Sequence, residues 1–269
     1  MALRIAVITD IHYGIDIGAK KGTQALPLVD EFIDAAAAFK ADLILNLGDE
    51  ISTRDPESDE KFKATLRHHF NRAACPVIKI DGNHCVRFQE RQSVSRSFDM
   101  DKFHIVMWNP YMNRYTRDGV IPDPQDIEWL ENDLSGTGKP TIILSHIPFR
   151  GPESEKKQLK RAQTEGLYYP SHFAEAENLQ EIIESSGKVM MCLSGHRHLD
   201  YHETANGVHH IIQQSLVEVV ADGKPSGAYN LIEIDDDEIR INGVGLKRNI
   251  PASLPVLVKP SSTPIPQVA

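Results

Sequence analysis

The chain has 269 residues, of which 41% are hydrophobic and 25% are charged, and its formal net charge is −9 at pH 7. With a mean hydropathy of −0.33, this is the composition of a globular protein, long enough for one large domain or two small ones. The negative charge argues against a protein that binds nucleic acid through a broad basic surface. No apolar run approaches the roughly 18 residues that would span a bilayer.

Three cysteines, Cys75, Cys85 and Cys192, stand at irregular spacing. An odd number without a regular pattern gives no disulfide framework. The apolar stretch near the N-terminus is only as long as a strand and lacks the cleavage site of a signal peptide. We therefore expect a cytoplasmic protein that does not associate with a membrane.

The first eighty residues show alternating strand and helix patterns. Residues 3–9 (LRIAVIT) form a continuous apolar run, typical of a strand buried on both faces, and residues 24–39 carry apolar side chains at helical spacing. The next predicted elements are a strand at 42–47, a helix near 57–72 and a strand at 76–80. This order predicts a parallel or mixed sheet that is covered by helices.

The pattern is looser in the following part of the chain. Residues 86–102 and 109–126 are polar or rich in Pro, Asn and Asp, and both are predicted to be loops on either side of a strand at 103–108. The elements predicted after them are a helix at 124–134, a strand at 140–144, a helix at 174–185, a strand at 188–193 and a β-meander formed by 208–213, 228–234 and 238–244.

The end of the chain is rich in proline from residue 251 onward, which predicts an extended tail. No linker or internal repeat divides the rest of the sequence. We therefore expect a single domain over residues 1–250 and a Pro-rich tail over residues 251–269. The apolar stretch 254–258 (LPVLV) can cover the edge of a sheet or a neighbouring subunit, so the sequence leaves open whether the protein forms a homo-oligomer.

Polar residues that can bind metal ions follow five of the predicted strands. They are Asp10 and His12 after strand 3–9, Asp49 after 42–47, Asn83 and His84 after 76–80, His146 after 140–144, and His196 and His198 after 188–193. In open α/β sheets, ligands bind beyond the carboxyl ends of the strands. The topology is therefore expected to bring these side chains together.

Carboxylate, imidazole and amide groups together suit divalent metals such as Mn, Fe and Zn. Seven such groups, the set without His84, are too many for one tetrahedral zinc ion, but they suit two ions that lie roughly 3.5–4 Å apart and share a carboxylate. The alternative interpretation makes Asp10 and Asp49 helix N-caps and the histidines ordinary polar residues at strand ends. Five fragments in order, all at strand ends, favour the metal site.

The series Asp10-x-His12, Gly48-Asp49, Gly82-Asn83-His84, His146 and Gly195-His196-x-His198 closely resembles the motif set of the calcineurin-like metallophosphoesterase superfamily over residues 10–198. The resemblance implies an α/β (α+β) fold, a four-layer αββα sandwich with mixed sheets, and a dinuclear metal centre at the C-terminal ends of the strands.

The resemblance also implies a role for each motif residue. Asp10, His12 and His198 would hold one metal ion, Asn83, His146 and His196 would hold the other, and Asp49 would bridge the two. A bridging hydroxide would be the nucleophile. His84 would contact the phosphate and protonate or stabilise the leaving oxygen.

One position departs from the family pattern. The residue after Gly82-Asn83-His84 is usually Asp or Glu, which orients the catalytic histidine, but here it is Cys85. A thiol accepts hydrogen bonds less well than a carboxylate, so another acid would have to orient His84, and Asp81 and Glu50 are the candidates. Cys85 itself is either a redox-sensitive group beside the metals or a small buried residue.

Four more residues are candidates for contacting the substrate. Arg150 and Arg197 neighbour proposed metal ligands, although simple surface solvation is the alternative for both. Tyr168 and His172 lie in the insertion 149–173, which is either a cap over the site or a solvated basic segment. If the stretch around Arg197 is extended, His196 and His198 both face the site and Arg197 points away.

The other histidines are predicted to be structural, namely His68, His69, His104, His202, His209 and His210. For the whole chain we predict a hydrolase that depends on two divalent metal ions, most simply a phosphodiesterase for a small substrate such as a cyclic nucleotide or a glycerophosphodiester. A phosphomonoesterase or nucleotide pyrophosphatase with the same core is the alternative. A non-catalytic protein-binding scaffold is a further alternative, and its signature would be the loss of metal ligands.

Overall fold

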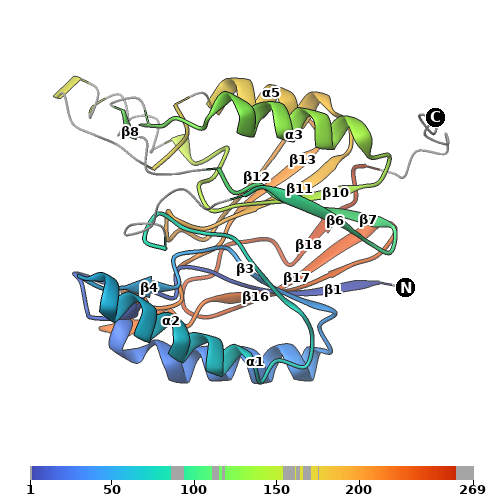
Figure 1. Cartoon of the computed structure of the whole chain (residues 1–269). Coiled ribbons are helices and arrows are strands. Elements are labelled where there is room, and N and C mark those ends of the chain that lie inside the picture. Colours follow the sequence, from blue (N-terminus) through green and yellow to red (C-terminus); the bar gives the residue numbers. More distant parts are fainter. Residues whose placement is uncertain are drawn as a thin grey trace.

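The computed structural model describes residues 2–85, 94–110, 115–116, 119–153, 161, 164–165, 171–174 and 176–258. Two six-stranded mixed sheets lie face to face, and a pair of helices covers the outer face of each sheet (Figure 1). The predicted four-layer αββα sandwich is therefore confirmed.

The first sheet has the strand order β18-β17-β16-β1-β3-β5. Its strands are β1 (Leu3–Ile8), β3 (Leu43–Asn46), β5 (Val77–Lys79), β16 (Tyr229–Ile234), β17 (Glu238–Val244) and β18 (Ser253–Pro255). β1, β3 and β5 are mutually parallel, whereas β16, β17 and β18 pair antiparallel.

The second sheet has the order β12-β13-β11-β10-β7-β6. Its strands are β6 (Arg96–Met100), β7 (Phe103–Met107), β10 (Thr141–Ser145), β11 (Val189–Ser194), β12 (Tyr201–Ala205) and β13 (Val208–Ile212). The four central strands are parallel, and β6 and β12 close the two edges as antiparallel partners. Three short pairs complete the strands: β2 (Tyr13–Gly14) with β4 (Ile51–Ser52), β8 (Tyr115–Thr116) with β9 (Gly119–Val120), and β14 (Val219–Ala221) with β15 (Lys224–Pro225).

The alternation of side chains along each buried strand creates three apolar layers. In β1, Leu3, Ile5 and Val7 point between the sheets, whereas Ala6 and Ile8 face the helices. The described helices are α1 (Ala25–Phe39) and α2 (Pro56–Phe70) on the first sheet, α3 (Pro124–Gly136) and α5 (Ala176–Ser185) on the second, and the short 3₁₀ helix Gly22–Gln24. Both faces of the central strands are thus buried, as their continuous apolar sequences predict.

The N-termini of α1 and α2 test the alternative interpretation, in which Asp10 and Asp49 are helix N-caps. α2 is capped by Asp55, whose carboxylate accepts a hydrogen bond from Ser58 N at 2.8 Å, and α1 has Gln24 at its N-cap position. Asp10 and Asp49 lie in the loops before these residues. The interpretation of Asp10 and Asp49 as helix N-caps is therefore wrong.

Two predictions for the strands are also wrong. The segments 86–102 and 109–126 are both predicted to be loops, but the first contains β6 and the second contains the short pair β8–β9. β6 pairs with β7 at the sheet edge, where a half-exposed polar strand is tolerated. The predicted C-terminal meander is split, because β13 pairs parallel with β11 in the second sheet whereas β16 and β17 belong to the first. Apolar alternation indicates a strand but does not choose its partner.

The apolar stretch near the C-terminus covers an edge of its own sheet. β18 pairs with β17, and the Pro255 carbonyl accepts a hydrogen bond from His209 Nε2 at 2.9 Å, so this strand also contacts the second sheet. Residues 259–269 lie outside the described part, and the domain division at residue 250 stays a prediction. Among the described helices, none has the length and apolar character to cross a membrane.

We predict a pH-dependent contribution of His104 to stability. Its ring contacts Asp133 at 3.0 Å and Asp99 at 2.7 Å, and Asp99 also pairs with Lys139. The hydrogen bond with Asp133, followed by that with Asp99, raises the pKa of His104 although burial opposes this. The stabilisation is full below the unfolded pKa of about 6.5 and is lost as pH rises through the higher folded pKa.

In denaturant unfolding, His104→Gln should lower the free energy of unfolding by about 1–2 kcal/mol at pH 5.5, as is typical of hydrogen bonds between charged groups. The difference in the free energy of unfolding between the wild type and His104→Gln should become smaller as pH rises above 6.5. A difference in the free energy of unfolding that does not change with pH would contradict the pH-dependent contribution of His104.

Candidate metal centre

Loops from both sheets meet at one edge of the sandwich. Three groups of side chains there have donor atoms that, within each group, all lie within 4.8 Å of one another. The groups are Asp10–His12–His198, Asp49–His146–His196 and His12–Asp49–His84. The parallel strands of the two sheets therefore bring together the side chains that the sequence places at their carboxyl ends.

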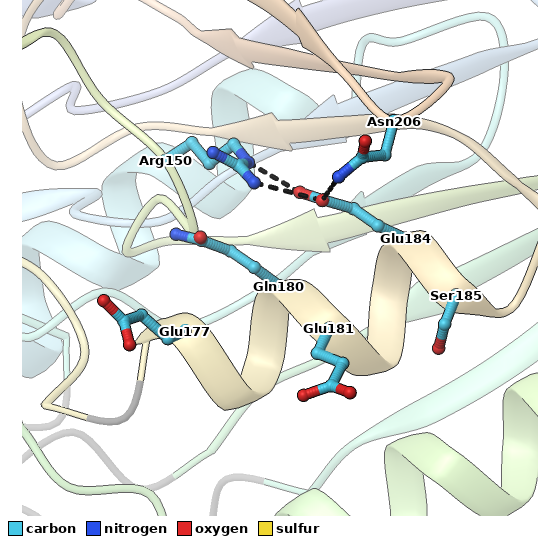
Figure 2. A pocket seen from close by; sticks show the side chains of 7 residues that line it. All are labelled: Arg150, Glu177, Gln180, Glu181, Glu184, Ser185 and Asn206. Atoms are coloured by element: carbon cyan, nitrogen blue, oxygen red, sulfur yellow. Dashed lines mark hydrogen bonds and ion pairs between the residues drawn. The ribbon is translucent and has the colours of Figure 1, made fainter.

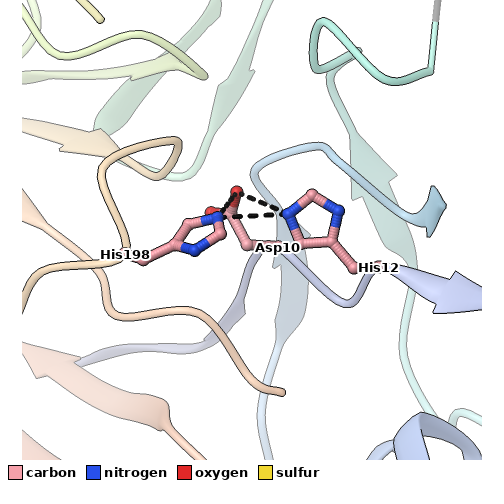
Figure 3. Close-up of side chains that lie close together, drawn as sticks. All are labelled: Asp10, His12 and His198. Atoms are coloured by element: carbon pink, nitrogen blue, oxygen red, sulfur yellow. Dashed lines mark hydrogen bonds and ion pairs between the residues drawn. The ribbon is translucent and has the colours of Figure 1, made fainter. Parts of the chain in front are cut away.

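The first group is compact and almost completely buried (Figure 3). His198 Nε2 lies 3.0 Å from Asp10 Oδ1 and 3.1 Å from His12 Nε2. His12 Nε2 in turn lies 3.6 Å from Asp10 Oδ1 and 3.7 Å from Asp49 Oδ2. Two imidazole nitrogens and two carboxylates thus face one small volume.

The second group shares Asp49 with the first. His146 Nε2 lies 3.4 Å from Asp49 Oδ2, and the rings of His146 and His196 pack edge to face with centroids 5.0 Å apart. Asp49 Oδ1 accepts a hydrogen bond from His84 N at 2.8 Å, so this carboxylate also fixes the loop that carries Asn83.

Two buried atoms test whether the group fits metal ions. Asn83 Oδ1 and His146 Nε2 are both buried, and neither has a hydrogen-bond partner among the described residues. A buried polar atom without a partner is costly, so such atoms need an explanation, and a bound metal ion is one. An amide oxygen and an imidazole nitrogen beside carboxylates are donors that divalent transition metals accept. The residues present therefore fit such ions.

The outer nitrogens of the histidines have partners of their own. His146 Nδ1 donates to the Leu47 carbonyl at 2.8 Å, His198 Nδ1 donates to the Glu218 carboxylate, and His12 Nδ1 lies 2.9 Å from Ser52 Oγ. Partners at Nδ1 set the ring orientation and leave Nε2 as the inward-facing donor atom, as in protein metal sites.

The loops that carry these residues have an uncommon backbone conformation. Positive φ angles occur at Asp10 (49°), His12 (44°), Asp49 (54°), His196 (65°) and His198 (54°). Asp and His adopt this region more readily than most residues, but each instance still costs about 1 kcal/mol or more. The segment around Arg197 is consequently bent, and the expectation that it is extended is wrong.

The glycines of the motifs are required by close approach. A Cβ at Gly48 would lie 2.9 Å from His146 Nδ1, and one at Gly82 would overlap Asp49 Oδ1. A Cβ at Gly195 would lie 2.5 Å from Asp10 Oδ2. Glycine is therefore needed here so that the loops of the two sheets can touch.

The buried carboxylates dominate the electrostatics. Burial would raise the pKa of Asp10, but the neighbouring histidines, chiefly His198, hold it well below its usual value. Burial would also lower the pKa of His146 and His198, but Asp49 raises that of His146 to about 9 and Asp10 raises that of His198 to about 10. Such a site has a strong preference for bound positive charge.

His84 lies at the rim of this cluster. Its ring packs edge to face on that of His12 with centroids 4.9 Å apart, and burial lowers its pKa to about 4 although Asp49 opposes this. Within the described part of the chain, its ring makes no hydrogen bond to an acid. Glu50, one of the two candidates for orienting it, is bound instead by Asn46 and Lys79.

Cys85 is buried and its side chain contacts the backbone at Glu50. Its sulfur accepts a hydrogen bond from Glu50 N at 3.4 Å, and its carbonyl accepts one from Lys63 Nζ at 3.3 Å. Cys85 therefore joins the His84 loop to the Asp49 loop. Burial, and then the Glu50 carboxylate, raises the pKa of its thiol, which favours the small buried residue over the redox-sensitive group.

Arg150 is directed toward Glu184 of α5 (Figure 2). Its Nε and Nη2 donate to the two carboxylate oxygens of Glu184 on α5, at 2.5 and 3.0 Å, and Asn206 donates to the same carboxylate. A cavity of about 360 Å³ lined by these residues lies beside α5. The interpretation of Arg150 as a phosphate-binding residue gains no support from this position, because its guanidinium is already held by a half-buried acid.

The other predicted substrate contacts have mixed positions. Arg197 lies half-buried between His196 and His198, and its amide donates to Gly195 O at 2.7 Å. His172 lies beside β9, where its carbonyl accepts a hydrogen bond from Val120 N at 2.9 Å. Tyr168 lies outside the described residues, so the predicted cap is not placed.

Sequence reasoning missed the groups that orient the histidines. Glu218 stands twenty residues after His198 as a lone acid between strands, and Ser52 is an ordinary polar residue after a strand. No spacing or motif marks either residue, because each acts through a contact made only in the folded chain.

We predict that Glu218→Gln weakens metal binding. The substitution keeps the size of the side chain but removes the charge that orients His198, and loss of such partners typically costs about 10- to 100-fold in metal affinity. Calorimetric titration with Mn²⁺ measures the effect, with the exposed helix position Glu31→Gln as control. Equal affinity in Glu218→Gln and the wild type would contradict the orienting role.

We also predict that Cys85 is chemically inert in the folded protein. Because thiolates react and this buried thiol resists ionisation, iodoacetamide should modify half-buried Cys75 but leave Cys85 and Cys192 unmodified, as read by mass spectrometry. Denatured protein, in which all three sites should react, is the control. Labelling of Cys85 in native protein would restore the redox interpretation.

Comparisons with known proteins agree with this geometry. A sequence profile described as calcineurin-like phosphoesterase matches residues 3–200. A search of curated proteins finds no match. Among solved structures, a dimetal phosphatase from Danio rerio superposes with a TM-score of 0.74 at 15% identity, covering 96% of this chain and 99% of its own.

Two other structures share the fold at 12% identity. A purple acid phosphatase from yellow lupin has a TM-score of 0.62, with 98% of this chain and 57% of its own chain covered. GAP50 from Plasmodium, titled the anchor in the inner membrane complex, has a TM-score of 0.57, with 97% and 90% covered. Since the profile spans well over half of the sequence, this chain belongs to the calcineurin-like phosphoesterase family, whose members are metal-dependent phosphoester hydrolases.

Proposed function

We propose that the protein is a two-metal phosphodiesterase that hydrolyses a small phosphodiester, such as a cyclic nucleotide or a glycerophosphodiester. The observation that supports this most directly is the meeting of two side-chain groups, one around Asp10 and one around His146, on the shared carboxylate Asp49. A shared carboxylate between two donor groups is the arrangement that two-metal hydrolysis needs.

In this proposal, each ligand keeps the role that the family resemblance assigns. Asp10, His12 and His198 hold one ion, Asn83, His146 and His196 hold the other, and Asp49 binds both. The two ions would supply an activated water molecule and neutralise charge on the phosphoryl group. Manganese, iron and zinc all suit these donors. A cytoplasmic location and a homo-oligomeric state remain predictions.

His84 is proposed to contact the reacting phosphate. With a pKa of about 4 its ring is neutral at pH 7, so it can donate an N–H hydrogen bond to the phosphate or to the leaving oxygen. Its backbone amide is fixed on Asp49, which positions the ring at the rim of both donor groups.

The position of Arg150 favours a diester over a monoester. A phosphomonoester carries up to two negative charges near neutral pH, whereas a diester carries one. Arg150 is held by Glu184, so one of the two arginines that were candidates for contacting the phosphate is engaged elsewhere. Phosphomonoesterase and nucleotide pyrophosphatase activity are the alternatives. The scaffold alternative gains no support from the ligand set, because all seven predicted ligands are present.

Metal analysis combined with two chromogenic substrates tests the proposal. The protein loaded with Mn²⁺ should contain two ions per chain and hydrolyse bis-p-nitrophenyl phosphate faster than p-nitrophenyl phosphate. Asp49→Ala should lose two-metal binding and at least about 100-fold in turnover, because the shared ligand serves both ions. The exposed position Asp237→Ala is the matched control.

Each adverse result contradicts a different part of the proposal. A strong preference for the monoester would refute the diesterase assignment but leave the metal centre intact. Two ions retained in Asp49→Ala would refute the bridging role. Absence of both metal and turnover after Mn²⁺ addition would favour the scaffold.

A further inference from the structure

The loop Gly195–Asp200 must be held by its surroundings. It carries His196 and His198, both with positive φ, so its own backbone preferences do not favour the conformation in which the two rings face the site. Residues in such conformations persist where other contacts determine them. Within the loop, His196 N donates to Asp10 Oδ2 at 2.9 Å and His198 Nδ1 contacts Glu218. The contacts at the two ends of the loop add to these and help to place the histidines for metal binding.

The far end of the loop is fixed by Asp200. Its side chain is only 2% exposed and forms an ion pair with Arg248, with Oδ1 and Nη2 2.7 Å apart. The other carboxylate oxygen, Oδ2, accepts hydrogen bonds from Asn249 N and from Ile250 N, the latter at 3.0 Å. One buried carboxylate thus connects the loop to the segment that follows β17.

Arg248 is itself fixed on the first sheet. Its Nη1 donates to the carbonyls of Tyr229 and Val244, at 3.0 and 2.5 Å, and its Nη2 donates to Asn230 Oδ1 at 2.5 Å. A Cβ at Gly243 would lie 3.3 Å from Nη2, so this glycine makes room for the guanidinium. Arg248 therefore has one fixed position, between β16 and the loop.

The same network reaches the near end of the loop. Asn230 Nδ2 donates to Gln213 Oε1, and Gln213 N donates to Ser194 O at 2.7 Å, at the end of β11. Gln213 and Asn230 are both fully buried. The first sheet therefore supports the loop at its start through Asn230 and at its end through Arg248.

We propose that Asp200 and Arg248 are positioning residues that hold the loop Gly195–Asp200 in its metal-binding conformation. The segment around Arg248 lies beyond the residues 3–200 that match the family, so metal affinity in this chain depends on a part of the protein that the family match does not include. This inference rests on the proposed function, since it concerns the same metal centre.

The test compares Mn²⁺ binding and metal-induced stabilisation in matched variants. Arg248→Met and Asp200→Asn should bind Mn²⁺ about 10- to 100-fold more weakly, as expected when partners that orient metal ligands are lost. The rise in Tm on adding Mn²⁺ should shrink accordingly. Arg248→Lys, which keeps the charge, should recover part of the affinity.

Arg240→Met is the matched control, because Arg240 is an arginine of β17 whose partly exposed ion pairs with Glu233, Asp235 and Glu238 involve no residue of the loop. It should bind Mn²⁺ like the wild type. Asp200→Asn retains the size of the side chain and an acceptor for the two amides, so it serves if Arg248→Met does not fold.

The variants could have a lower Tm without Mn²⁺ but bind Mn²⁺ as tightly as the wild type and show the same metal-induced rise in Tm. That result would overturn the inference and leave the Asp200–Arg248 pair a purely structural contact. If the wild type binds two ions and the variants bind them equally tightly, only this inference is refuted and the proposed function stands. A wild-type protein that binds no Mn²⁺ would refute the proposed function, and this inference with it.

Discussion

The burial of Asp10 and Asp49 among imidazole rings is the constraint on which the rest of the structure depends. Two carboxylates removed from water require compensating positive charge, and the surrounding histidines outweigh burial and hold the pKa values of both below the usual value. The loops must therefore approach one another closely enough for the histidines to reach both carboxylates, which explains the glycines beside these residues and the positive φ angles within the loops.

The four-layer fold is the means by which this approach is stabilised. Parallel strands in both sheets end at the same edge of the sandwich. Their apolar side chains form three buried layers, and none of these layers includes the polar residues at that edge. The stability of the sandwich can thus offset the strain in the loops. Around the donor groups, Glu218, Ser52 and the Leu47 carbonyl orient the rings, while Arg248, fixed on the first sheet, pairs with Asp200 at the end of the last loop.

Much of the fold could be predicted because its signals are local. Strands such as 3–9 and 140–144 are continuous apolar runs, and the polar residues directly after them had to lie at the sheet edge. Pairing was less predictable: β6 is polar because it is an edge strand, and β13 joins the second sheet although β16 and β17 join the first. Arg150 follows a metal-binding motif in sequence, yet its partner Glu184 comes from a helix 34 residues away.

The sequence by itself determined which candidate metal-binding residues follow each strand, and in what order. Residue types and the periodicity of apolar positions can be read along the chain without knowledge of any tertiary contact. Only the tertiary structure decided which nitrogens of His12, His146 and His198 face inward, which groups orient these rings, and that Arg150 binds Glu184. Those properties depend on contacts between residues such as Asp200 and Arg248, which are distant in the chain and carry no mutual pattern. Cys85 shows both sides: its identity marked a departure from the family, and only its position beside Glu50 revealed what the residue contacts.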